Sequence, residues 1–165
     1  MSVKITYSVA PDVAIEEAVE NVRKQVKRRT YLAANELRNS ALLILRGQRS
    51  GRRYKVPGTY RRQRDKVSGK MKNGRYYTAS APGEPPAVRT GAFRNSWQVS
   101  QGGVKELYGS YIARIESDLR VSNGRYNLGE LLEEGTSRMD PRPYVEKTLQ
   151  HAEKNIVRIY SAPYE

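Results

Sequence analysis

Three closely spaced prolines constrain the middle of this chain. Pro82, Pro85 and Pro86 lie within residues 77–97, whose sequence is YTASAPGEPPAVRTGAFRNSW. Each proline fixes its own φ angle and pushes the preceding residue toward extended conformations, so this stretch can form neither a helix nor an interior strand. We therefore expect an extended, Pro-rich connector over residues 78–90, between a helical front half and a strand-rich back half.

The connector is expected to end in a short helical turn. The side-chain oxygen of Thr90 can cap a turn through residues 92–94, and Gly91 permits close backbone approach. Trp97 would then open a strand. A surface loop that merely links two elements is the alternative interpretation of these residues.

The front half predicts a strand followed by a long helix. Apolar residues alternate with polar ones over residues 3–9, which is typical of a half-buried strand. Over residues 11–46 apolar residues recur three or four apart, with acidic residues near the start and basic residues near the end, as the helix dipole favours. The stripe consists of Ile15, Val19, Val22, Val26, Ala33, Leu37, Ala41 and Ile44.

This helix would be on the order of 50 Å long. A bend or break near residues 28–31, where the stripe is weakest, is left open. Because the helix is longer than a small core can cover, part of its stripe is expected to face a neighbouring subunit. An ordinary core helix with a solvated basic face is the other reading.

The net charge of +13 is concentrated in one segment. Between Arg46 and Arg75 there are twelve Lys or Arg residues and one acid, Asp65, so this segment carries +11 and the rest of the chain only +2. Hydrophobic periodicity is absent there, and we expect residues 47–75 to form a projecting basic arm. The arm could contact DNA phosphates or an acidic protein, or simply be solvated. Its expected contact residues are Arg49, Arg52, Arg53, Lys55, Arg61, Arg62, Arg64, Lys66, Lys70 and Lys72.

The back half predicts a hairpin, a short helix and a final helix. Alternation around residues 97–99 and 107–115 favours a hairpin that turns at residues 101–103. Residues 126–134 can form a short helix that Gly135 ends. The final helix would start at residues 140–143 and turn one apolar face to the core. That face consists of Val145, Leu149, Ala152, Ile156 and Ile159.

These elements predict an α+β fold in a single domain, residues 1–165: a long N-terminal helix and a C-terminal helix packed on a small antiparallel sheet, with the basic arm. A chain of 165 residues without cysteine can build its core without disulfides. No signal peptide or membrane-length apolar run is present in the sequence, which favours a soluble protein that is not exported.

No residue pattern points to catalysis. Residues 68–70 look like the end of a phosphate-binding loop, but Arg64 replaces its first glycine and Met71 its Ser or Thr. His151 is the only histidine and has no nucleophile or metal ligand near it in sequence, so a surface histidine is the better interpretation. We expect no enzymatic activity, no cofactor and no metal.

Four short motifs in the chain form a recognisable series. Residues 81–86 read APGEPP and residues 90–96 read TGAFRNS; later, residues 133–137 read EEGTS and residues 142–143 read RP. Their order resembles the small head-to-tail joining proteins of tailed bacteriophages, called neck or tail-completion proteins. The resemblance spans roughly residues 11–160, and residues 56–73 look like extra length relative to that family.

The resemblance implies a structural protein of the virion neck, assembled in the bacterial host cytoplasm. Several copies, with six as the expected number, would form a homo-oligomeric ring around the DNA channel. The ring would join the portal and its adaptor or head-closure protein to the tail-tube or tail-terminator proteins, and packaged DNA is a further partner. The residues expected at subunit or partner interfaces are Pro82, Glu84, Pro85, Arg89, Thr90, Phe93, Glu133, Gly135, Thr136 and Arg142.

A second hypothesis comes from the basic segment alone. A cytoplasmic nucleic-acid-binding protein could act through the arm, with phosphate contacts from the basic residues and base stacking from Tyr54 and Tyr60. The sequence carries no helix-turn-helix or zinc-finger pattern, so the charge favours binding without sequence recognition. This hypothesis predicts tight binding to DNA or RNA by the protein alone, whereas the joining protein would associate with itself or with neck partners.

Overall fold

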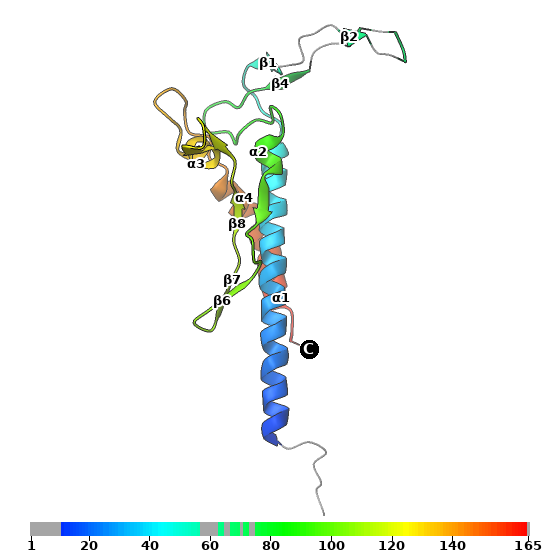
Figure 1. The fold of residues 1–165 in the computed structure, drawn as a ribbon, viewed down its shortest axis with the longest axis vertical. Coiled ribbons are helices and arrows are strands. Elements are labelled where there is room, and N and C mark those ends of the chain that lie inside the picture. The colour runs from blue at the N-terminus through cyan, green and yellow to red at the C-terminus, as the bar shows by residue number, and fades with distance from the viewer. Residues whose placement is uncertain (1–10, 57–62, 65–66, 70, 73–74, 165) are drawn as a thin grey trace, which may run out of the picture.

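The computed structural model describes residues 11–56, 63–64, 67–69, 71–72 and 75–164. It is a mixed α+β fold, as predicted (Figure 1). The strand expected at residues 3–9 lies outside the described residues. The elements are α1 (Pro11–Arg46), β1 (Arg53–Lys55), β2 (Gln63–Arg64), β3 (Met71–Lys72), β4 (Tyr76–Thr78), α2 (Ala92–Asn95), β5 (Trp97–Val99), β6 (Lys105–Leu107), β7 (Ser110–Ile112), β8 (Ile115–Ser117), β9 (Arg120–Val121), β10 (Tyr126–Asn127), α3 (Leu128–Glu134) and α4 (Val145–Ser161).

Helix α1 is a single helix of 36 residues, and it has no break near residues 28–31. Its C-terminal part packs against α4, and small residues line the contact. Ala33 and Ala34 of α1 are 7% exposed, Ala41 is 1% exposed and Ala152 of α4 is 0% exposed. Side chains this short let two helix backbones approach closely, so the α1 and α4 contact forms the centre of the core.

Polar pairs set the antiparallel register of α1 and α4. The Nδ1 of His151 lies 2.9 Å from the Oγ of Ser40, and Asn155 donates to the Glu36 carboxylate at 2.7 Å. As the residue number rises along α4, the partner's number falls along α1. His151 is therefore an exposed residue with a structural hydrogen bond to a buried serine.

Arg29 binds the C-terminal end of α4. It is 8% exposed, its guanidinium donates to the carbonyl oxygens of Tyr160 and Pro163, and it lies 3.9 Å from the centre of the Tyr164 ring. A cation next to the last carbonyls of a helix stabilises it, because these groups carry partial negative charge and lack partners within the helix. Arg29 thus lies at the point on α1 where α4 ends and stops covering it.

The predicted face of α4 was partly wrong. Thr148 and Ala152 are the buried residues of this helix, whereas Val145 is 44% and Leu149 is 51% exposed. Thr148 can take a buried position because its hydroxyl donates to the Tyr144 carbonyl at 2.7 Å. The helix is therefore rotated relative to the face that apolar residues alone indicated.

The strands of the described residues pair as small two-stranded antiparallel ladders. In the back half β5 pairs with β8 and β6 pairs with β7, so the two ladders lie along one long hairpin. Its turn is at Tyr108 and Gly109, both with positive φ, and not at residues 101–103 as predicted. Residues 101–103 instead lie between the ladders, where Gly103 donates to the Ser100 carbonyl at 2.9 Å.

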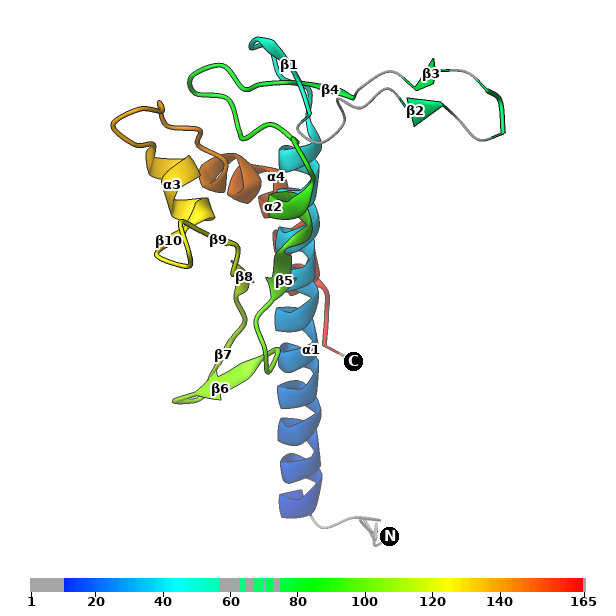
Figure 2. The same cartoon turned by 45° about the horizontal axis from the view of Figure 1, so that its top comes forward.

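The N-terminal part of α1 extends beyond the rest of the described fold (Figure 1 and Figure 2). Its apolar side chains are exposed there: Val13 is 43%, Ile15 is 64%, Val19 is 46% and Val22 is 43% accessible. The apolar stripe predicted from the sequence is thus covered only toward its C-terminal end. None of the helices in the described part of the chain has the length and apolarity needed to cross a membrane.

Candidate functional site

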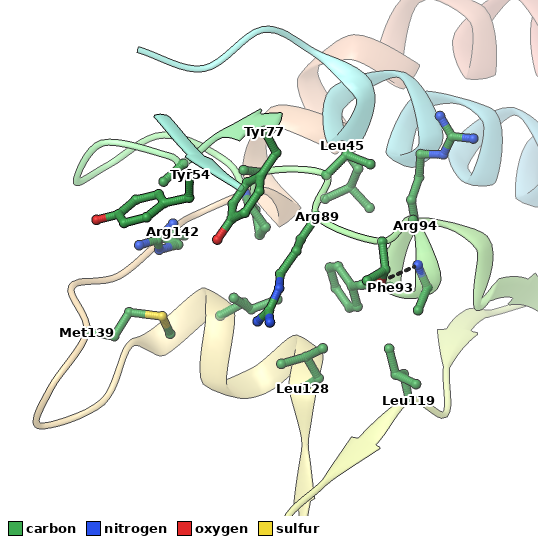
Figure 3. A pocket seen from close by; sticks show the side chains of 18 residues that line it. Leu45, Tyr54, Tyr77, Arg89, Phe93, Arg94, Leu119, Leu128, Met139 and Arg142 are labelled. Carbon is green, nitrogen blue, oxygen red and sulfur yellow. Dashed lines mark hydrogen bonds between the residues drawn. The ribbon is translucent and has the colours of Figure 1, made fainter. Parts of the chain in front are cut away.

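A groove of about 510 Å³ lies beside the C-terminal end of α1 (Figure 3). The connector and α2 line one part of it, and α3 with the loop that follows α3 lines another. The lining is mainly apolar, and Arg89, Arg94 and Arg142 are its charged residues. The other principal lining side chains are Leu45, Tyr54, Tyr77, Val88, Phe93, Leu119, Leu128, Leu132 and Met139.

Glu84 ties the connector to the segment that follows α1. Its carboxylate accepts hydrogen bonds from the Ser50 hydroxyl at 2.7 Å, from the Ser50 backbone N–H at 3.1 Å and from the Ala81 N–H at 2.9 Å. These bonds, with a smaller contribution from the nearby Arg49 cation, lower the Glu84 pKa to about 2. Glu84 therefore stays ionised and fixes the connector at this point.

Gly51 lets the two segments approach closely. Its N–H donates to the Ala79 carbonyl at 3.0 Å, and a Cβ at this position would lie 2.6 Å from the same oxygen. Real Cβ atoms do not come this close to a backbone oxygen. The conformation of the connector therefore requires glycine here.

Arg49 uses its guanidinium within the chain. It donates to the Pro86 carbonyl at 3.1 and 3.3 Å, to the Ile44 carbonyl at 2.7 Å and to the Gln48 carbonyl at 2.8 Å. Burial lowers the Arg49 pKa, and the negative charge of Glu84 acts in the opposite direction. Arg49, predicted as a DNA or partner contact, thus holds the connector against the end of α1.

Arg142 and its neighbours bind the N-terminal half of the connector. The Arg142 guanidinium donates to the hydroxyl of buried Ser80 at 2.8 Å, and the Gly83 N–H donates to the Pro141 carbonyl at 3.2 Å. Lys147 of α4 donates to the Gly83 carbonyl at 2.9 Å. Two segments that are about 60 residues apart, and that contain the sequence motifs or adjoin them, are thus joined directly.

Glu133 caps the N-terminus of α4. One of its carboxylate oxygens accepts from the backbone N–H groups of Tyr144 at 2.9 Å and Val145 at 3.3 Å. The N-cap residue Tyr144 makes no side-chain cap of its own, so Glu133 provides the acceptor that this helix start needs. Glu133 therefore fixes α3 relative to α4.

Gly135 and Thr136 shape the loop between these helices. Gly135 has φ 80°, and a Cβ there would meet the Met139 carbonyl at 2.7 Å. Thr136 and Met139 exchange two backbone hydrogen bonds, and the Thr136 hydroxyl accepts from Arg138 N–H at 3.2 Å. The loop is compact and places Met139 in the groove.

Three aromatic rings pack in edge-to-face geometry next to the groove. The ring centres of Phe93, Trp97 and Tyr144 lie 5.6 to 5.9 Å apart. Burial, and then the charges of Glu133 and Glu130, raise the Tyr144 pKa, so its hydroxyl remains protonated. The Phe93 ring, which also lines the groove, is held by this cluster.

The predicted interface residues therefore divide into two groups. Arg89, Thr90, Phe93 and Arg142 line the groove; the Thr90 hydroxyl accepts from Ala92 N–H at 3.3 Å, although Gly91 is the N-cap. The other six do not line the groove but hold the segments around it or lie near it: Pro82, Glu84, Pro85, Glu133, Gly135 and Thr136. Sequence reasoning missed Leu119, Leu128, Leu132 and Met139, which carry no motif signal beyond being apolar.

The predicted contact residues of the basic segment are only partly described. Arg52, Arg53 and Lys55 are exposed on or next to β1, which pairs with β4. The Arg53 guanidinium lies 4.7 Å from the Tyr76 ring centre, and Tyr54 stacks on Tyr77 with ring centres 5.9 Å apart. Arg61, Arg62, Lys66 and Lys70 lie outside the described residues, and of Arg64 and Lys72 only the backbone pairing of β2 with β3 is described. The projecting arm therefore stays a prediction.

No group of three His, Cys, Asp or Glu residues that could hold a metal ion occurs in the described part of the chain. The motif side chains Glu84, Glu133 and Arg142 bind backbone groups or the hydroxyls of Ser50 and Ser80. Comparison with family models, with curated proteins and with solved structures found no match for this chain.

Proposed function

We propose that this chain is a structural protein of the tailed-phage neck, which joins head to tail as part of a ring around the DNA channel. One observation carries the proposal: the N-terminal part of α1 extends from the fold with Ile15, Val19 and Val22 exposed along one face. An apolar helix face of this kind marks a protein interaction surface in a protein that stays in water. A protein whose role is to join others needs such a surface.

The roles of the motif residues support the same proposal. Glu84, Glu133 and Arg142 each bind a segment distant in sequence. Arg142 lines the groove, and Glu84 and Glu133 hold the segments around it in place. A non-enzymatic assembly protein is the function that such an arrangement suits.

The proposal includes defined partners. The ring would consist of copies of this chain, with six as the expected number, between the adaptor or head-closure protein and the tail-tube or tail-terminator protein. Apolar burial would supply the affinity, and charge would govern register and association rate. The basic segment would face either packaged DNA or an acidic surface of one partner.

Light scattering at low and high salt, with and without duplex DNA, tests the proposal. We expect an oligomer of ring-forming mass that persists at high salt, because apolar contacts are not screened by ions. The proposal would be overturned if the protein is a monomer at both low and high salt and does not bind purified neck or tail proteins.

A nucleic-acid-binding protein is the second candidate, and β1 favours it. Arg52, Arg53 and Lys55 are exposed next to Tyr54 and Tyr76, and basic residues with aromatic rings can bind a phosphate backbone and stack on bases. This candidate predicts a monomer or dimer that binds DNA or RNA tightly by itself. Portal, head-closure and tail-tube genes beside the coding gene would instead favour the neck protein.

A further inference from the structure

We propose that the exposed stripe of α1 in one copy docks into the arginine-rimmed groove of the next copy, so that the copies associate head to tail. This inference rests on the proposed function, in which the chain forms a ring, and it names the two surfaces that meet. The occupant of the groove is thus a second copy of this chain.

The stripe has the geometry of a helix that docks through one face. Ile15, Val19 and Val22 are spaced four and three residues apart, which places them on one side of an α-helix. Each is more than 40% exposed, and the stripe runs on into the part of α1 that α4 covers. No described residue of this chain covers this part of the stripe, so it is free to take a partner in the proposed contact.

The stripe is acidic at its edge. Residues 11–22 contain four acids and no basic residue: Asp12, Glu16, Glu17 and Glu20. Only Asp12 lies in the first turn, where the helix dipole stabilises a carboxylate. Glu16 and Glu20 are four residues apart and follow one flank of the apolar stripe. Arg23 comes next on this flank, and Glu20 and Arg23 both lie near Tyr111 of β7 in the same chain, so the purely acidic part of the flank is Asp12 and Glu16. A basic, apolar partner surface complements this pattern.

The groove presents the complementary chemistry. Among the residues that the structure describes, its lining contains Arg89, Arg94 and Arg142 and no carboxylate, and the remaining side chains are mainly apolar. Arg89 is exposed and extends from the connector into the groove (Figure 3). Apolar docking would supply affinity, and pairing of Glu16 with Arg89 would set the register of the bound helix.

The two surfaces cannot meet within one copy. Leu45 lines the groove, whereas Val19 lies 26 residues earlier on the same unbroken helix, a separation of about 40 Å at 1.5 Å per residue. A contact between two different surfaces is heterologous, and repetition of such a contact closes into a ring or continues as a filament. Head-to-tail docking is thus compatible with a ring, whereas a two-fold α1 pair would leave the groove arginines without a counter-charge.

Complementation between two variants tests the docking mode. Val19→Asp damages the stripe and Arg89→Glu damages the groove, and both residues are exposed, so the fold should persist in each variant. We expect each variant alone to raise the dissociation constant for self-association at least tenfold. An equimolar mixture should form a heterodimer, because it retains one intact stripe and one intact groove, and it should not grow further.

Three outcomes of this experiment would each contradict a different part of the inference. If Arg89→Glu assembles as the wild type does while Val19→Asp does not, the stripes pair with each other and the groove inference is wrong. If the wild type forms a ring that neither variant changes, the docking mode is wrong but the proposed function stands. A wild type that stays monomeric with and without neck partners would overturn both.

Cysteine cross-linking provides a second readout, because the natural chain contains no cysteine. A mixture of Val19→Cys and Val88→Cys copies should give a covalent heterodimer under oxidation, since Val88 is exposed in the groove lining. Glu17→Cys is the matched control, because two residues along a helix turn a side chain to nearly the opposite side. Val19→Cys copies that cross-link with one another would contradict the proposal.

Discussion

The Glu84 carboxylate accepts three hydrogen bonds at the point where the connector meets the end of α1. Its folded-state pKa of about 2 lies below the ordinary value of 4.5, so the folded protein holds this group ionised more strongly than the unfolded chain does. The resulting stability is fully present above about pH 4.5 and is lost as the pH falls toward 2.

Glu84→Gln should therefore reduce the acid sensitivity of the protein. We expect the variant to be less stable than the wild type near neutral pH, with a smaller fall in the free energy of unfolding between pH 4.5 and 2. Urea titrations at several pH values measure this difference. Glu153→Gln, at an exposed position of α4, is the control. An unchanged pH slope in Glu84→Gln would contradict the assignment.

Gly51→Ala tests the close approach of the connector. The added Cβ would lie 2.6 Å from the Ala79 carbonyl oxygen, so backbone must move, and we expect a loss of about 1–3 kcal/mol in the free energy of unfolding. Gln48→Ala, at an exposed position of the same segment, is the control. Urea unfolding measures both variants. Equal losses in the free energy of unfolding would show that the close approach of Gly51 to Ala79 does not cause the loss.

At this scale the sequence indicated which residues matter but not what they do. The motif picked out Glu84, yet its partner Ser50 lies 34 positions earlier, and a hydrogen bond over that distance depends on how α1 ends. Nothing in the sequence indicated the structural role of Arg49. It was one basic residue among many in the sequence, whereas its contacts to Ile44 and Pro86 depend on the tertiary fold.

Helix α4 depends on a carboxylate from another helix. Glu133→Ala would leave the N–H groups of Tyr144 and Val145 without their acceptor, and we expect a loss of about 0.5–2 kcal/mol in the free energy of unfolding. Glu133→Gln should lose less, because it keeps an acceptor oxygen but not the charge. Glu134→Ala, at the exposed neighbouring position, is the control. Thermal unfolding followed by circular dichroism measures all three, and equal effects of the 133 and 134 variants would exclude the cap.

Elements with strong local signals were predicted well. The periodic stripe gave α1 its bounds, and Gly135 gave the end of α3. The hairpin turn was missed because Tyr108 has φ 48°, a conformation that glycine favours and an aromatic residue rarely adopts. The orientation of α4 was missed because a buried threonine that satisfies its own hydroxyl looks polar in a sequence pattern.

For the whole molecule, the basic segment governs the predicted response to DNA. Neutral replacement of Arg61, Arg62 and Arg64 by Gln should weaken duplex DNA binding and reduce the slope of log affinity against log salt by about 0.9 per lost phosphate contact. Gln replacement of Lys24, Lys27 and Arg28, exposed on α1, changes the net charge equally and is the control. Fluorescence anisotropy at several salt concentrations measures the slope. Equal effects of the two triple variants would show that total charge, and not this segment, determines binding.

The groove could not have been predicted from the sequence. Its walls come from the end of α1, the β1 and β4 ladder, the connector, α2 and α3, and the apolar residues that line it look like ordinary core residues in the sequence. Only the relative placement of these elements turns Leu119, Leu128 and Met139 toward a common space. The motifs located its edges, because they hold the connector and the loop after α3.

The unbroken α1 has a mechanical consequence. It is a stiff rod, anchored along one part by α4 and Arg29, whose other part extends from the body. A small tilt of the anchored part would therefore be amplified into a much larger displacement of the tip. In an assembly built through that tip, the packing of Ala33, Ala41 and Ala152 would set the diameter of the assembly as well as the stability of one subunit.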